Sequence, residues 1–140
     1  MKPWALLWIA ALLGFAGCSG GHRRAAEAKL REVGPTTLRG EAAGFYKQLF
    51  VAPTRRYFLP ALADCPPSFR RFRPLRVRAY ADGFSLALAD VRGAEEGLYV
   101  VPLGMDNPPR ASRHAAFQRI EDGLYWYSFS ENADALKPVP

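Results

Sequence analysis

The chain has few of the side chains from which common active sites are built. Of its 140 residues, only two are histidines and two are cysteines. It contains no glycine-rich phosphate loop, no Gly-x-Ser-x-Gly nucleophile motif and no His/Cys spacing typical of a metal site. Its acidic residues are scattered, so no pair of carboxylates stands out for acid–base chemistry. We therefore expect no cofactor and no metal, and the sequence favours a protein that is not an enzyme.

No apolar run is long enough to span a bilayer comfortably. The longest, residues 4–16, covers 13 residues. As a helix it would rise about 20 Å, whereas the hydrocarbon core is about 30 Å thick. Lys2 precedes this run and small residues follow it. A charged start, a short apolar middle and a small-residue end are typical of an export signal that is removed from the mature protein.

The end of this segment resembles a known class of signal. Its last four residues are Phe15, Ala16, Gly17 and Cys18. The quartet is similar to the signal of bacterial lipoprotein precursors, in which small residues precede a lipid-modified cysteine. The resemblance covers residues 1–19 and implies cleavage between Gly17 and Cys18, with diacylglyceryl and palmitate-type chains on Cys18. Ser19 stands where an aspartate would retain such a protein at an inner membrane. The implied location is the cell envelope, at the periplasmic face of the outer membrane where the cell has one.

Acidic residues are outnumbered by basic ones. The chain has 19 Lys and Arg against 13 Asp and Glu, a net charge of +6, and loss of Lys2 with the signal leaves +5. Five closely spaced arginines are candidates for binding an anion: Arg70, Arg71, Arg73, Arg76 and Arg78. Guanidinium groups bind phosphate and carboxylate in bidentate fashion, so an anionic lipid headgroup or glycan is a candidate ligand. The alternative is a solvated, arginine-rich strand face. The export signal argues against nucleic acid as a partner.

Cys65 is the only cysteine besides Cys18. With Cys18 lipidated, no disulfide forms within the chain. An odd cysteine in an exported protein indicates either an intermolecular disulfide or a free thiol. A third interpretation is a small, half-buried residue in the turn before Pro66.

The sequence divides into four parts. They are a cleaved signal peptide (1–17), a lipidated cysteine with a flexible tether (18–35), a single domain (36–130) and a disordered tail (131–140). In the domain, apolar residues at helical spacing predict a helix over 41–50. The predicted fold class is α+β, with one N-terminal helix packed on an antiparallel β-meander of about five strands.

An Asp-Gly pair at 82–83 predicts a hairpin. Its strands are 75–81 and 84–90, and a two-residue turn sets Ala81 opposite Phe84. This register places the apolar residues on one face and the arginines on the other.

The rest of the sheet is expected from a strand over 97–103 and a second hairpin. The hairpin joins 115–121 to 124–130 through Asp-Gly, and its simplest register sets Arg119 opposite Trp126. The alternation of that pairing is poor.

We interpret the chain as an envelope lipoprotein, anchored in a membrane through Cys18. In the first hypothesis, its domain binds another envelope protein or supports an assembly without catalysis. In the second, the arginines bind an anionic envelope polymer or lipid headgroup. A third, a small hydrolase acting on cell wall or lipid, requires a cleft with convergent polar groups.

Overall fold

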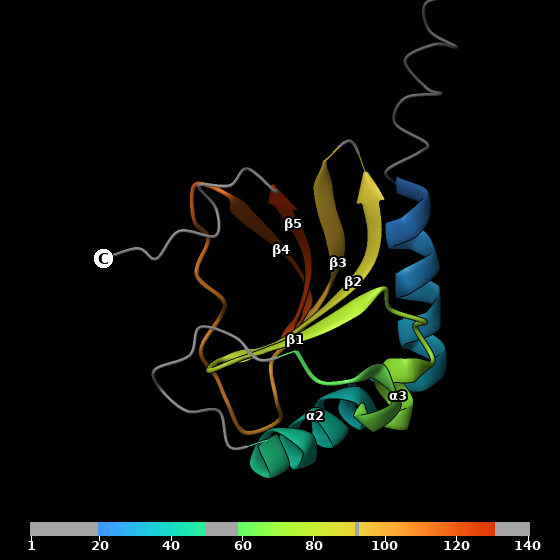
Figure 1. Ribbon diagram of the computed structural model, residues 1–140, viewed down its shortest axis with the longest axis vertical. Coiled ribbons are helices and arrows are strands. Elements are labelled where there is room, and N and C mark those ends of the chain that lie inside the picture. Colours follow the sequence, from blue (N-terminus) through green and yellow to red (C-terminus); the bar gives the residue numbers. More distant parts are fainter. Residues whose placement is uncertain (1–19, 50–58, 92, 131–140) are drawn as a thin grey trace, which may run out of the picture.

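Helical segments cover one face of a five-stranded antiparallel sheet (Figure 1). The structure is a computed structural model that describes residues 20–49, 59–91 and 93–130. A helix over residues 20–33 precedes α2 (Pro35–Leu49), the short helical turn η1 (Leu62–Asp64) and α3 (Pro67–Arg70). The strands are β1 (Arg76–Tyr80), β2 (Gly83–Val91), β3 (Ala94–Val100), β4 (Ala115–Glu121) and β5 (Leu124–Ser130). The predicted α+β class is confirmed.

The strand order is β1-β2-β3-β5-β4, so the sheet is not a simple meander. The first three strands are sequential neighbours, as predicted. The long connection 101–114 then carries the chain past the position of β5 to the outer edge, where β4 lies. The tight turn after β4 returns β5 to pair with β3. A two-residue turn forces the strands that it joins to pair with each other, whereas a long loop lets the next strand pair elsewhere in the sheet. The connection 101–114 can therefore place β4 at the edge and leave the position beside β3 to β5.

The predicted flexible tether is wrong over residues 20–33, which form a helix packed on the sheet. Ala26, Leu30 and Val33 are buried at the spacing of one helix face. Gly34 ends the helix with a positive φ of 91°, and its amide donates to the Leu30 carbonyl at 2.8 Å. The folded domain therefore includes residues that the sequence assigned to the tether.

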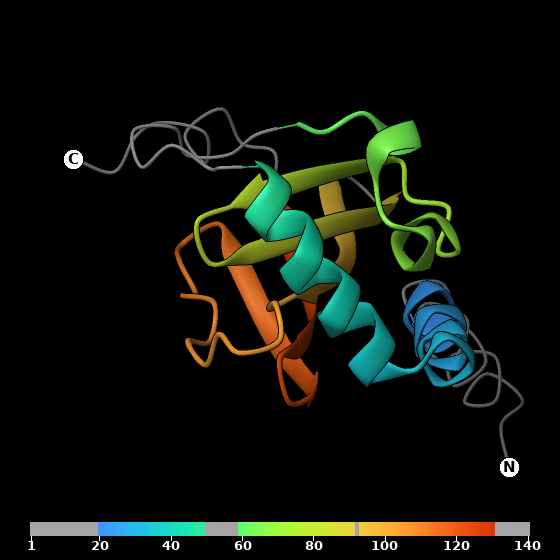
Figure 2. The same cartoon turned by 90° about the horizontal axis from the view of Figure 1, so that it is seen from below.

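The second helix starts earlier than predicted. It begins at Pro35, where a missing N–H is no loss, and buries Leu38, Ala42 and Phe45 against the sheet. Figure 2 shows α2 lying across the strands, beside the helix over residues 20–33.

The first hairpin has the predicted faces but a different register. Tyr80 pairs with Gly83, so the turn residues are Ala81 and Asp82. The predicted pairing of Ala81 with Phe84 is wrong by two residues, a shift that preserves which side chains face the core. Gly83 is the first residue of β2. Only glycine fits there, because a Cβ would lie 2.6 Å from the carbonyl oxygen of Val100.

The second hairpin contains a β-bulge. Glu121 pairs with Leu124, but Arg119 then pairs with Tyr125 rather than with Trp126 as predicted. The extra residue, Ile120, packs against the core. The bulge explains the poor alternation, because it changes the face to which the rest of β4 points. The third strand also ends earlier than predicted, at Val100.

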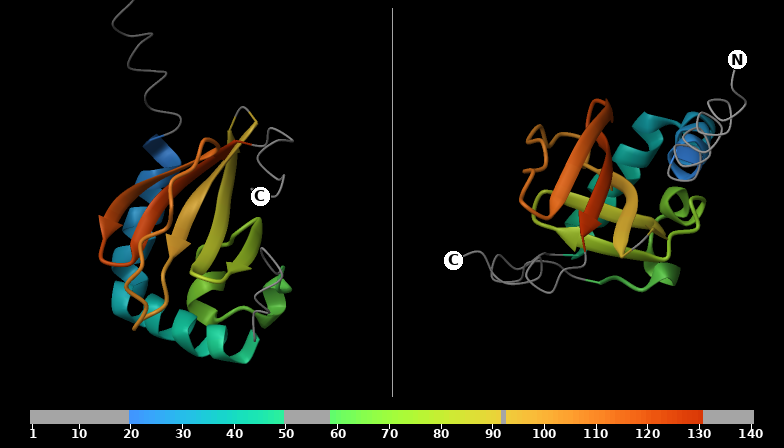
Figure 3. Two further views of the ribbon diagram at one scale, coloured as in Figure 1. Left: turned by 90° about the vertical axis from the view of Figure 1, so that its left-hand side faces the viewer. Right: turned by 90° about the horizontal axis from the view of Figure 1, so that it is seen from above.

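The sheet has two different faces. The face under the helices carries a continuous apolar core that includes Phe84, Leu98 and Leu124, all fully buried. The opposite face carries an aromatic cluster around Tyr99 and Tyr127. No described helix covers that second face, as the two views of Figure 3 show.

Candidate functional site

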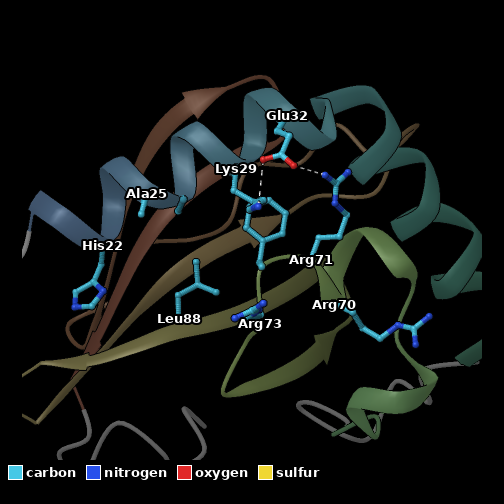
Figure 4. Close-up of a pocket in the computed structure, with 10 residues that line it drawn as sticks. His22, Ala25, Lys29, Glu32, Arg70, Arg71, Arg73 and Leu88 are labelled. Atoms are coloured by element: carbon cyan, nitrogen blue, oxygen red, sulfur yellow. Dashed lines mark hydrogen bonds and ion pairs between the residues drawn. The ribbon is translucent and has the colours of Figure 1, made fainter.

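A pocket lies between the helix over residues 20–33 and the segment from α3 to β1. Its volume is about 570 Å³. Basic side chains dominate its lining, which is formed by His22, Ala25, Ala26, Lys29, Glu32, Arg70, Arg71, Phe72, Arg73 and Leu88 (Figure 4). We call it the basic pocket.

Helical spacing and a strained turn place the basic side chains at this pocket. His22, Lys29 and Glu32 come from the helix over residues 20–33, about two and one turns apart. Arg70 ends α3, and Arg73 follows in the left-handed region with φ 50°. The Arg73 amide donates to the Arg70 carbonyl at 3.0 Å, which closes the turn before β1. A non-glycine residue in this conformation is strained, and such strain is frequent at functional sites.

The pocket carries a net charge of +3 with His22 neutral, because four cations face one acid. That acid, Glu32, lies 3.2 Å from Lys29 Nζ and 2.5 Å from Arg71 Nη2. The hydrogen bond and charge of Lys29, with a smaller effect of Arg71, lower the pKa of Glu32 below its usual value. Arg70 and Arg73 form no ion pair with any described residue. In Figure 4 the guanidinium of Arg70 points away from Glu32. The pocket therefore offers uncompensated guanidinium groups.

The structure does not bring the five predicted arginines together. Arg76 and Arg78 lie on β1 and point to the face of the sheet opposite the helices. They share Glu95 of β3, which is fully buried, and Arg76 also pairs with Asp90 at 2.8 Å. Arg76 Nε donates to Glu95 at 2.7 Å, and Arg78 Nη1 donates to it at 2.5 Å. Only Arg70, Arg71 and Arg73 line the basic pocket.

Glu95 is the centre of a buried ionic network that the sequence did not reveal. The Tyr127 hydroxyl donates to it at 2.7 Å. Burial acts to raise the pKa of Glu95, but the hydrogen bonds from Arg78 and Tyr127 and the charge of Arg78 outweigh it and lower the pKa. The signal present in the sequence was the alternation of Arg76 and Arg78 on one strand face, because buried arginines need an acid on the same face of the sheet.

Cys65 is buried and forms no disulfide. Its thiol donates to the Ala61 carbonyl at 3.5 Å. Burial, with a smaller effect of Asp64, raises the pKa of this thiol and so disfavours the reactive thiolate. The geometry favours a structural cysteine over an intermolecular disulfide.

The predicted cleavage and lipidation residues, Gly17 and Cys18, lie outside the described residues, as does the predicted tail 131–140. Within the described ranges, no helix is both long and apolar enough to cross a membrane. Among those same residues, no three His, Cys, Asp or Glu side chains gather so as to hold a metal ion. No protein family, curated protein or solved structure matches the chain.

Proposed function

We propose that the chain is an envelope lipoprotein, anchored through Cys18, whose domain is a non-enzymatic binding module. The signal-like residues 1–19 support the anchor. The helix over residues 20–33, which packs on the sheet, includes residue 20, only two residues after Cys18. Two residues span at most about 7 Å. A lipid on Cys18 would therefore hold this domain against the membrane surface, on the periplasmic side of an outer membrane where one exists.

The basic pocket carries our proposal for what the module binds. A net charge of +3 and two guanidinium groups without ion pairs favour an anionic group, either phosphate or carboxylate. At the surface of a membrane, such a group is supplied by a lipid headgroup or by an anionic envelope polymer. Arg76 and Arg78 are not part of this proposal, because Glu95 already holds them.

A protein partner is the second candidate. Both outer strands, β1 and β4, pair on one side only within the described sheet. Most side chains of β4 are exposed or half-buried. An open edge of this kind accepts an added strand, which would make the domain a support for an envelope assembly.

The anchor is tested by the variant Cys18→Ser in the native host. The variant should lose the lipid and remain an unprocessed precursor, as seen by electrophoretic mobility and mass spectrometry. Lipidation and processing of Cys18→Ser would contradict the proposed anchor.

The binding activity is tested by calorimetry on the detergent-solubilised, lipidated protein. Two probes distinguish the sources of the anion: short-chain phosphatidylglycerol for a headgroup, and polyphosphate for a soluble polymer. Replacing Arg70, Arg71 and Arg73 together by alanine should weaken binding at least about tenfold, a change of about 1.4 kcal/mol. High salt should weaken binding as well, because it screens exposed charges.

A matched control removes the same charge elsewhere. Arg110, Arg113 and Arg119 are exposed, and none of them lines the basic pocket. If their replacement by alanine weakens binding equally, only net charge matters and the pocket is not the site. Discrete proteins that co-purify at high salt from cross-linked envelopes, together with no anion binding, would favour the protein partner.

A further inference from the structure

A second pocket lies on the sheet face opposite the helices and has a different chemistry. Its volume is about 220 Å³. Every strand of the sheet contributes to it, together with Pro109 and Arg110 of the connection 101–114. Five of its lining side chains are aromatic: Tyr80, Tyr99, Phe117, Tyr127 and Phe129. We call it the aromatic pocket.

The aromatic walls are held in place by one another and by two acids, the half-buried Asp82 and the buried Glu95. The rings of Tyr99 and Phe117 meet edge to face with centroids 5.3 Å apart, and those of Phe117 and Tyr127 are 6.5 Å apart. The Tyr99 hydroxyl donates to Asp82 at 2.5 Å, as the Tyr127 hydroxyl does to Glu95. These ring contacts and hydrogen bonds fix the orientation of the walls, which favours binding through preorganisation.

Ser85 gives the pocket an unsatisfied polar group. Its side chain lines the pocket and the residue is 3% exposed. The Ser85 hydroxyl lies close to the hydroxyl of Tyr127. Burial and Glu95 raise the pKa of Tyr127, and the neighbouring Ser85 hydroxyl acts to lower it. Nevertheless, the Ser85 Oγ has no hydrogen-bond partner of good geometry among the described residues. Buried hydroxyls are nearly always paired, so this one is suited to a polar group of a ligand.

The charges at the pocket nearly cancel. Among the lining residues, Asp82 and Glu95 are acidic and Arg110 is basic. Arg76 and Arg78 form ion pairs with Glu95 and so neutralise its charge. The carboxylates disfavour an anion and the three guanidinium groups disfavour a cation. The surroundings thus select a neutral ligand.

We propose that the aromatic pocket binds one ring of a neutral sugar. A pyranose has apolar C–H faces that stack on aromatic rings and hydroxyls that pair with groups such as Ser85 Oγ and the Asp82 carboxylate. The volume exceeds the cavity of about 150 Å³ that holds benzene and is smaller than the pockets of drug-sized ligands, which start at about 300 Å³. The site therefore fits a single ring rather than an extended chain, and this conclusion does not depend on the anchor or on the basic pocket.

Saturation-transfer NMR on the detergent-solubilised protein tests this proposal. The probes are methyl β-glucoside and N-acetylglucosamine, with benzyl alcohol as an apolar ring and benzyltrimethylammonium as a cation. We expect millimolar binding of at least one sugar, with the strongest transfer to protons on one face of its ring. Phe117→Ala should abolish that transfer, and Ser85→Ala should weaken binding at least about fivefold.

The two variants differ in their effect on folding, which keeps the test decisive. Ser85→Ala removes an unpaired buried hydroxyl and should leave the thermal midpoint unchanged or raise it. A weaker sugar affinity in this variant is therefore a loss of ligand contact, not of structure. Arg113→Ala, at an exposed residue that lines neither pocket, is the control and should not change sugar binding.

Three results would overturn the proposal. The first is no transfer to either sugar. The second is preferential binding of benzyl alcohol or of the cation, with Ser85→Ala behaving as the unmodified protein. The third is sugar binding that survives Phe117→Ala, which would place it elsewhere on the molecule.

Discussion

Two groups of arginines lie within nine residues of one another and have different surroundings. Arg70, Arg71 and Arg73 leave a short helix and a strained turn, and they line a pocket of positive charge. Arg76 and Arg78 lie on a strand, and both donate to a carboxylate that is fully buried. A run of like side chains in a sequence therefore indicates a binding patch only after each member has been tested for a buried partner.

The two acids that face these groups differ in the same way. Glu32 retains 55% of its side-chain exposure, so its pairs with Lys29 and Arg71 lie in water. Exposed pairs contribute little to stability, because water screens the charges. Glu95 is fully excluded from water, where a charge is tolerated only when it is paired and hydrogen-bonded. Removing each acid in turn and comparing the free energies of unfolding measures this difference.

Removing Glu95 should have the largest effect on stability. Glu95→Ala removes the buried carboxylate that Arg76 and Arg78 share, while Arg76 keeps its pair with Asp90, and it leaves the Tyr127 hydroxyl without its acceptor. Breaking a buried ion pair from one side typically costs about 3–5 kcal/mol, and we expect a loss of that size in the free energy of unfolding. Urea denaturation followed by circular dichroism measures it. Glu32→Ala is the control, for which we expect a much smaller loss because its ion pairs are exposed to water. Similar losses in the two variants would contradict the contrast between the groups.

Acid should remove part of the same stabilisation. The pKa of Glu95 in the folded protein is below its ordinary value of 4.5. A lowered folded-state pKa contributes stability that is fully present above the unfolded-state pKa and is lost as the pH falls through the folded-state value. The urea midpoint should therefore fall between pH 5 and the acid limit, as roughly set by ordinary carboxyl pKa values. Glu95→Gln starts from a lower midpoint and should fall less steeply. Parallel acid profiles for the two proteins would mean that Glu95 does not carry this dependence.

Much of the fold follows from local patterns in the sequence. Alternation and the Asp-Gly turns located four strands, and the faces of the first hairpin were correct even though the pairing of Ala81 with Phe84 was not. A register error of two residues has no effect on which face is buried. The order of β4 and β5 was not predictable in this way, because the long connection 101–114 carries no local signal of where it leads.

The candidate sites were less predictable, because they depend on contacts between distant segments. The basic pocket needs Lys29 and His22, which come from a segment interpreted as a tether on the strength of its glycines and arginines. The spacing of Ala26, Leu30 and Val33 was the available sign of a packed helix. The pairing of Glu95 with Arg78 depends on sheet topology across three strands.

The smallest expected effect concerns Arg73, and it separates the strain of the turn from the charge of the side chain. At φ 50° an alanine is strained by about 1–2 kcal/mol and a glycine is not. Replacing Arg73 by glycine should therefore give a protein more stable than replacing it by alanine, by about 0.5–1 kcal/mol after allowance for the greater freedom of glycine in the unfolded chain. Both variants lose the same guanidinium, so both should weaken polyphosphate binding equally, by several-fold. Urea denaturation and calorimetry on the two proteins give both numbers. Equal stabilities would show that the turn relaxes around alanine. Unchanged anion binding in Arg73→Gly would show that the ligand does not need the Arg73 guanidinium, so the strained turn does not serve to present it.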